Sequence, residues 1–510
     1  MAFEDEEWQG IVLPKTVYVN YVTTKLTSYS SPMWFMTNLY TWLGPNFSLY
    51  FLLSFLLRVI VAFSSFVFLY IFTKDRLSSF LGGVLIAVGF SGIQTTFETI
   101  NMISYISYIG WLVFLCAFFL IQNKVLFRYL ITMGISLSVA TFIGSFRIYP
   151  LYAWVIMADG LRALMHFKKG VLKIFLVRQL VVIAVFLLLY KIGIFSWYSR
   201  DASSNQSISD LDKFSSDSGA FLASLNSKVI VNFVKGIGNV IVPDIFDRSG
   251  NINLFIGVTF IIFLISLFLY AIKKRTSKTY LLLIFFIWPL LFYASYFLVY
   301  INGFASKETA ILQSSMRYLY PPFIGFSIAV AFLLSAILKK NKNWGRKALI
   351  FMLIYISIHA VTTHFYLSNL SKQRDGAYMV RVWEQIKRVV PITSLNTKKE
   401  NVFYFETDGS ARAIYTINDG FIGHAIAVYK VDNKPAKFDA TEIGNFGRLI
   451  APPIIAYEGL IDYIKKDLTK DSEDAVWDRI FAFRVINGTV IDIKEDVKVR
   501  VEESLKNDKI

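Results

Sequence analysis

Long apolar runs separated by short charged segments dominate the first 370 residues of the chain. Each run approaches the roughly 20 apolar residues that an α-helix needs to cross the hydrocarbon core of a bilayer. The pattern therefore predicts about ten transmembrane helices. The pair interrupted by Arg147 and Pro150 is also compatible with a broken or re-entrant hairpin. The predicted spans cover residues 47–72, 79–96, 102–122, 127–145, 148–165, 176–196, 252–272, 280–301, 319–338 and 348–368.

The regions on either side of these spans have a different pattern. Residues 1–46 form an outer segment with an acidic motif and amphipathic, aromatic stretches that suit a membrane interface. Residues 47–370 form the transmembrane bundle, with a Ser/Asp-rich outer loop at 197–251.

Hydropathy falls after residue 370, and the pattern there predicts a small α+β domain over residues 371–510. An amphipathic helix is predicted to begin near Arg381. Alternating apolar positions predict strands, and Asn487-Gly488 is a turn signal. The predicted strands are Val402–Glu406, Ala425–Val431 and Ile480–Ile486.

Charge predicts the orientation of the bundle. The net charge of +16 arises in the first 370 residues, which hold 30 Lys and Arg against 14 Asp and Glu. With the N-terminus outside, 18 of those 30 cations fall in inside loops, as the positive-inside tendency requires. These loops are Lys74–Arg76, Lys124–Arg128, Arg162–Arg178, Lys273–Lys278 and Lys339–Lys347. The C-terminal domain then lies on the extracytoplasmic face of the cell membrane. A basic domain with aromatic platforms, typical of a nucleic-acid binder, is absent from the sequence.

Composition excludes several kinds of site. Cys116 is the one cysteine, so the 510 residues contain no disulfide framework and no thiolate metal cluster. The four histidines have no metal-ligand spacing, which argues against histidine-bound zinc or haem.

The acidic cluster Glu4-Asp5-Glu6-Glu7 stands next to hundreds of mostly apolar residues. Carboxylates this dense are costly beside a membrane unless they face water. We interpret them as part of an aqueous catalytic pocket on the outer face. The alternative is a solvated N-terminal tail.

Two ionisable residues occur close to or within the spans. Arg58 is central in a 26-residue apolar run, so it either faces a polar cavity within the bundle or snorkels to the surface, which is difficult from this position. Glu98 lies in a short outer loop. It either faces the same pocket as Asp5 or forms a structural capping box with Thr95.

Arg147, Lys307 and Arg317 are cations on the predicted outer side, where the positive-inside tendency predicts few. Arg317 stands directly before a span, next to Tyr318, and interfacial anchoring would explain both residues. The other interpretation is phosphate recognition, because a guanidinium matches a phosphoryl group bidentately and keeps its charge when desolvated.

Three stretches resemble the glycosyltransferase-C superfamily, polytopic enzymes that transfer a sugar from a polyprenyl-phosphate carrier. The acidic cluster is similar to that family's first outer-loop motif. Ser31-Pro32-Met33 with Leu43-Gly44-Pro45-Asn46-Phe47 resembles its R-P-L and F-G-x-N stretch, with Ser31 where Arg is usual. Arg317-Tyr318-Leu319-Tyr320-Pro321 resembles its R-Y-x-Y-x-P motif. The family's first helix is missing, so we expect an apolar segment upstream of Met1.

The resemblance implies roles for these residues. Asp5 would be the general base, with Glu4 or Glu6 as substitutes, and Glu98 would orient the acceptor. Arg317 and Tyr318, with Arg147 or Lys307, would hold the phosphate, and Arg58 would face the substrate cavity. A divalent cation, Mg or Mn, held by Asp5 and Glu98 is an open alternative. The partners would be the lipid bilayer, the polyprenyl-phosphate sugar donor, and a glycan, lipid or protein acceptor.

A secondary transporter or a flippase for lipid-linked sugars is the alternative function. It explains Arg58 and the interruption at Arg147. However, the ionisable residues of transporters concentrate near the midplane of the membrane, whereas most candidates here belong to the outer rim.

Overall fold

Seven helices in the computed structural model are long and apolar enough to cross a membrane, counted over the residues that the structure describes. They confirm a polytopic helical membrane protein, but the predicted number of about ten spans is not confirmed. The structure describes residues 39, 42–43, 47–97, 99–121, 126–144, 149–165, 169–191, 227–246, 250–303, 313–391, 401–418, 448–450 and 456–507.

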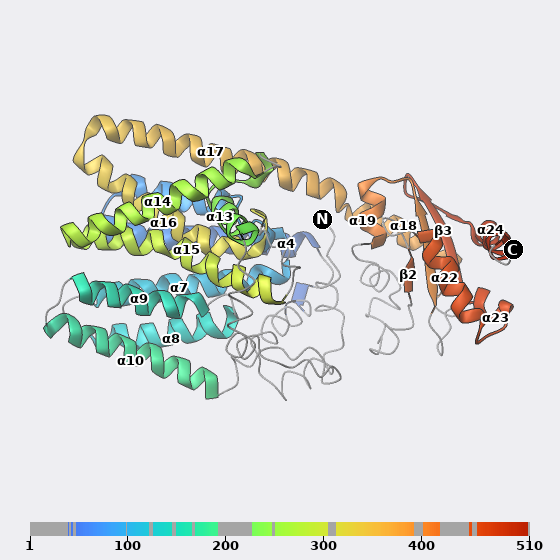
Figure 1. The fold of residues 1–510 in the computed structure, drawn as a ribbon, viewed down its shortest axis with the longest axis horizontal. Coiled ribbons are helices and arrows are strands. Elements are labelled where there is room, and N and C mark those ends of the chain that lie inside the picture. Colours follow the sequence, from blue (N-terminus) through green and yellow to red (C-terminus); the bar gives the residue numbers. More distant parts are fainter. Residues whose placement is uncertain are drawn as a thin grey trace. The chain divides into compact units, whose positions relative to one another are not determined.

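Large apolar side chains on these helices point away from the protein. Phe255 and Phe351, for example, are 71% and 70% exposed. Apolar surface as extensive as this is costly in water, so hydrocarbon is its natural environment. The seven helices, labelled in Figure 1, are α4 (Phe47–Thr73), α7 (Ile103–Leu120), α10 (Lys169–Lys191), α14 (Asn251–Lys274), α15 (Ser277–Gly303), α16 (Tyr320–Lys340) and α17 (Lys342–Gln373).

The other three predicted spans are shorter helices. The span predicted at 79–96 is α5 (Arg76–Val88), whose 13 residues rise about 20 Å, less than the roughly 30 Å of a hydrocarbon core. It ends early because Gly89, the residue after Val88, has an extended ψ of 135°, and Gly92, with a φ of +73°, then keeps the chain out of a helical path. The remaining helices of this part are α6 (Gln94–Phe97), η1 (Thr99–Met102), α8 (Phe127–Gly144), α9 (Tyr149–Met165), α13 (Ser227–Ile241), η3 (Asp244–Phe246) and η4 (Arg317–Leu319).

Aromatic side chains fill the interior between the helices. α7 packs along α8, and α15 packs along α16. Trp288 of α15 is fully buried, stacks on Phe292 with ring centroids 4.9 Å apart, and donates from Nε1 to the carbonyl of Pro321. A Cβ at Gly325 would lie 2.3 Å from the Trp288 ring, so the absence of a side chain there lets α16 approach α15.

The chain divides into two compact units, and one of them contains residues 366–510 together with the described residues 39, 42–43 and 47–50. This unit contains a four-stranded sheet in the order β2-β1-β3-β4. β1 pairs in parallel with β2 and β3, and β4 is antiparallel to β3. The strands are β1 (Val402–Thr407), β2 (Arg448–Ile450), β3 (Ile480–Ile486) and β4 (Thr489–Asp492).

The predicted α+β character and two of the predicted strands are therefore confirmed, while Ala425–Val431 lies outside the described residues. The predicted turn is also correct: Asn487 and Gly488 join β3 to β4 with φ of +49° and +79°, as a tight hairpin requires. The predicted amphipathic helix begins five residues before Arg381, because Asp375 caps it. The helices of this unit are α18 (Gly376–Val389), α19 (Ala411–Asn418), α22 (Ala456–Leu468), α23 (Glu473–Trp477) and α24 (Lys494–Asn507).

Candidate functional site

Arg58 of α4 lies against the broken end of α5. Its Nε donates to the carbonyl of Ala87 over 2.8 Å, and its Nη2 donates to the carbonyl of Gly89. The last carbonyls of a helix have no partner within the helix, and inside a membrane no water replaces one. Arg58 therefore terminates α5 in the way that a positive charge favours a helix C-terminus.

The rest of the Arg58 guanidinium is also held by the protein. Nη1 donates to the hydroxyl of Thr96 over 2.6 Å, and this hydroxyl lies 2.6 Å from the hydroxyl of Tyr105. The guanidinium carbon lies 4.9 Å from the ring centroid of Tyr320. Arg58 is 2% exposed, and no carboxylate of the described residues pairs with it. These contacts show that Arg58 stabilises the break in the helix after α5. A contact between Arg58 and substrate stays a prediction.

The break in the helix after α5, which begins at Gly89, packs against the segment that precedes α16. Gly92 donates its N–H to the carbonyl of Ser314 over 2.7 Å, and Gln94 donates its N–H to the carbonyl of Ser315 over 2.9 Å. The N–H of Arg317 in turn donates to Oε1 of Gln94 over 2.9 Å. Two segments more than 200 residues apart thus exchange backbone hydrogen bonds inside the helical unit. We call residues 89–97 and 313–320 together the polar seam.

A third group of residues fixes the seam. Nδ1 of His359 in α17 accepts the N–H of Phe90 over 3.0 Å, and its Nε2 lies 3.1 Å from the carbonyl of Ile241. Asp244 and Ser314 exchange two hydrogen bonds, of 2.9 and 3.0 Å. The seam is consequently held by hydrogen bonds from α4, α17 and the segment at the end of α13.

The predicted site residues fall into two groups. Arg58, Arg317 and Tyr318 are described, and both arginines border residues 94–97 of the seam: Arg58 bonds Thr96, while the Arg317 carbonyl lies 3.4 Å from the Thr95 hydroxyl. The Arg317 guanidinium carbon is 5.4 Å from the Tyr318 ring centroid. The predicted residues outside the described part of the chain are Glu4, Asp5, Glu6, Glu98, Arg147 and Lys307.

The sequence interpretation missed a buried ion pair between α9 and α10. Arg178 was placed among the cations of an inside loop, but it is 1% exposed and pairs with Asp159. Gln179 donates to Asp159 Oδ2 over 2.9 Å, and Arg178 Nη1 donates to the carbonyl of Phe118 near the end of α7 over 2.8 Å. The signal was present in the sequence, because Asp159 is an acid within an apolar run.

The described residues contain no group of three or more His, Cys, Asp or Glu side chains that could hold a metal ion. Asp5 and Glu98, the residues predicted for a divalent cation, belong to the part that the structure does not describe.

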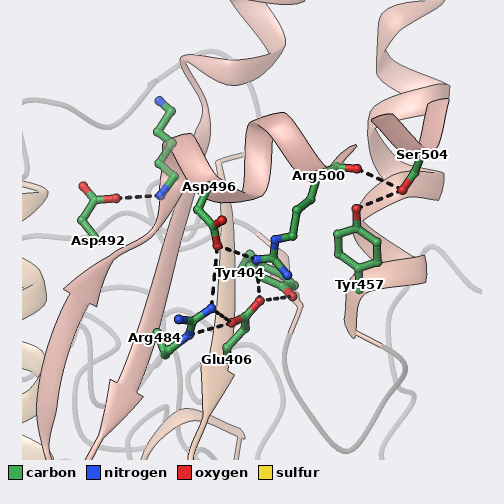
Figure 2. Close-up of polar contacts among 9 residues, drawn as sticks. Tyr404, Glu406, Tyr457, Arg484, Asp492, Asp496, Arg500 and Ser504 are labelled. Atoms are coloured by element: carbon green, nitrogen blue, oxygen red, sulfur yellow. Dashed lines mark hydrogen bonds and ion pairs between the residues drawn. The ribbon is translucent and has the colours of Figure 1, made fainter. Parts of the chain in front are cut away.

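A second polar cluster lies on the sheet of the C-terminal unit (Figure 2). Glu406 accepts from Nη2 of Arg484 and from Nη2 of Arg500, each over 2.7 Å, and Asp496 lies 3.2 Å from Arg500. Burial alone would raise the pKa of Glu406, but the hydrogen bonds from Arg500 and Arg484 outweigh it and lower that pKa. Two cations face two carboxylates here, so the cluster is a balanced link between the sheet and α24.

Comparison with known proteins adds no relative. No family model matches the chain, and no curated protein or solved structure matches it.

Proposed function

We propose that the chain is an integral-membrane glycosyltransferase that moves a sugar from a polyprenyl-phosphate carrier to an envelope glycan, lipid or protein acceptor at the extracytoplasmic face. The observation that supports this proposal is that the Arg58 side chain and the Arg317 backbone both bond the same short stretch of the polar seam, at Thr96 and Gln94. The departure of a lipid phosphate needs fixed cations, and a cation on a rigid support is worth most because it does not reorganise during the reaction.

The two arginines differ in what they can do. Arg58 uses its N–H groups on Ala87, Gly89 and Thr96, so it positions the seam. The side chain of Arg317 is partly exposed, while its backbone N–H and carbonyl are the groups bonded to Gln94 and Thr95. In the proposal, Arg317 holds the phosphate of the donor, with Tyr318 beside it.

The other half of the chemistry belongs to the acids. A carboxylate removes the proton of the acceptor hydroxyl while the oxygen of that hydroxyl attacks the anomeric carbon of the sugar. The bond from the anomeric carbon to the lipid phosphate breaks, and the phosphate oxygen leaves with the bonding electron pair. Asp5 is the proposed base, Glu4 and Glu6 are its substitutes, and Glu98, directly after the seam, orients the acceptor. Arg147 or Lys307 would add a second cation to the phosphate site.

The test incubates membranes that contain the full chain with a labelled polyprenyl-phosphate sugar and follows transfer of the label. Asp5→Asn should abolish transfer, and Arg317→Ala should lower it by roughly 10²-fold or more. Arg346→Ala, which removes an exposed arginine at the start of α17, is the matched control and should leave transfer unchanged. If the wild type transfers the label and neither Asp5→Asn nor Arg317→Ala lowers that transfer, the roles proposed for Asp5 and Arg317 are contradicted.

The alternative, a transporter or flippase for lipid-linked sugars, predicts a different product. In sealed vesicles it would move the labelled carrier across the membrane without forming any glycosyl product. Arg58 is the observation in its favour, because a cation inside a bundle often marks a substrate path. This alternative would be supported if the wild type moves the carrier without transferring any sugar and Arg58→Met abolishes that movement.

A further inference from the structure

The C-terminal unit has two adjoining polar hollows outside the polar seam. One, of about 490 Å³, lies between α18 and the β3–β4 turn, and the other, of about 400 Å³, lies between α18, α19 and the end of α17. Arg381 and Asn487 line both hollows. We call the two together the arginine groove.

Arg381 is preorganised in this groove. Its guanidinium carbon lies 5.5 Å from the ring centroid of Tyr378, which is itself 4% exposed and so provides a fixed platform. A Cβ at Gly488 would lie 2.6 Å from Arg381 Nη2, so the guanidinium occupies the space that a side chain there would fill. Tyr378 and the turn thus restrict the guanidinium at a point where it lines both hollows.

The charges along the groove favour an anion. Lys372, Arg388 and Arg412 line it together with Arg381, against the carboxylates of Glu384 and Asp408. Asp408 has a structural role in the groove, because its two oxygens accept hydrogen bonds from the backbone N–H groups of Asn487 and Ser410, each over 2.9 Å. These bonds, that from Asn487 first, lower the pKa of Asp408 and keep it ionised as a structural brace.

Tyr378 supplies a neutral donor at the floor of the groove. Its hydroxyl is buried and lies close to the backbone of Gly488 and the side chain of Ser410. Burial, followed by the nearby charge of Asp408, raises the pKa of Tyr378, so the hydroxyl keeps its proton at neutral pH. The guanidinium carbon of Arg412 also lies 5.3 Å from the centroid of this ring, and Arg412 Nη1 lies 3.6 Å from Asp375 Oδ2.

We propose that the arginine groove binds a phosphate group, with Arg381 as its bidentate ligand and Arg388 and Lys372 as supporting cations. A planar guanidinium held over an aromatic ring matches two phosphoryl oxygens at once and loses little side-chain entropy on binding. The phosphate belongs either to a soluble molecule or to the headgroup of a phospholipid. This site is separate from the polar seam and does not depend on the proposed transfer reaction.

The test titrates the full chain in detergent by calorimetry with two probes: inorganic phosphate, and a short-chain phosphatidic acid. Binding of inorganic phosphate indicates a soluble ligand, and binding of phosphatidic acid alone indicates a headgroup. For the probe that binds, Arg381→Ala should weaken affinity by roughly tenfold or more. Arg381→Lys, which keeps the charge but loses the planar fork, should also weaken it, by a smaller factor.

Lys466→Ala is the matched control, because it removes one exposed cation from α22 of the same unit without touching the groove. It should bind the probe as the wild type does. The proposal is overturned if neither probe binds, or if Arg381→Ala and Lys466→Ala weaken binding equally. Arg381→Lys also guards against misfolding as the explanation, since it keeps the positive charge and a long aliphatic side chain beside Tyr378.

Discussion

Arg58 in α4 donates a 2.6 Å hydrogen bond to the hydroxyl of Thr96, 38 residues later in the chain. This bond joins the helix before α5 to the segment after it, and two further bonds from Arg58 fill the carbonyls of Ala87 and Gly89 between them. Arg58 therefore bonds the interruption of this helix at three points, while Ser314 and His359 hold the residues between them.

Arg58→Ala should destabilise the protein strongly, because it leaves two buried carbonyls without donors and creates a cavity. We expect a loss of about 3–5 kcal/mol, seen as a lower midpoint of thermal unfolding in detergent. Arg76→Ala, which removes an exposed arginine from the first turn of α5, should change stability by less than about 0.5 kcal/mol. Equal midpoints for the two variants would show that Arg58 does not hold the break.

Asp159→Asn should destabilise the α9–α10 contact, because Arg178 would remain buried without its counter-charge. The expected loss is about 3–5 kcal/mol, and replacing both residues in Asp159→Asn/Arg178→Met should recover part of it. A double-mutant cycle of denaturation midpoints measures this coupling. Additive losses from the two single variants would mean that the pair contributes nothing as a pair.

Gly92→Ala should be far more damaging than a similar change elsewhere. Its φ of +73° is strained for alanine, and the added Cβ would lie 2.3 Å from the backbone nitrogen of Tyr320. We expect a loss of roughly 2–5 kcal/mol or failure to accumulate in membranes. Gly160→Ala in α9, where a Cβ meets nothing within 4 Å, is the control and should be neutral or slightly stabilising.

Glu406 should make the stability of the C-terminal unit dependent on pH. Its pKa is lowered in the folded state, so its stabilising contribution is complete above the ordinary glutamate value of about 4.3 and is lost as the pH falls through the lowered pKa. The denaturation midpoint of the wild type should fall between about pH 5 and about pH 2 more steeply than that of Glu406→Gln.

Glu503→Gln is the control for this titration, because Glu503 is an exposed glutamate of α24. It should retain the steep dependence of the wild type. A wild-type slope no steeper than that of Glu406→Gln would show that the ion cluster in Figure 2 does not titrate as the geometry indicates.

Hydrophobic patterning predicted the class of fold well, because long apolar runs and the Asn487-Gly488 turn signal depend on local sequence alone. It extended the second span to residue 96, whereas α5 ends at Val88. The interruption is stabilised by Arg58, Ser314 and His359, which are distant in sequence, and a window of neighbouring residues contains no information about such partners.

The candidate site was predictable to a similar extent. A cation in the middle of an apolar run identified Arg58, and motif resemblance identified Arg317. That the two border the same four residues of the seam follows from tertiary packing. Arg178 was misassigned for a related reason: charge counting treats every cation near a predicted span end as a loop residue, and its burial depends on Asp159.

The two hydrogen bonds of His359 have a chemical consequence for its imidazole ring. Because Nδ1 accepts a hydrogen bond from the backbone N–H of Phe90, the ring proton resides on Nε2, which faces the carbonyl of Ile241. The ring therefore exists as one neutral tautomer with both nitrogens engaged. To shuttle a proton or ligate an ion, it would first have to release one of the two backbone segments that it links.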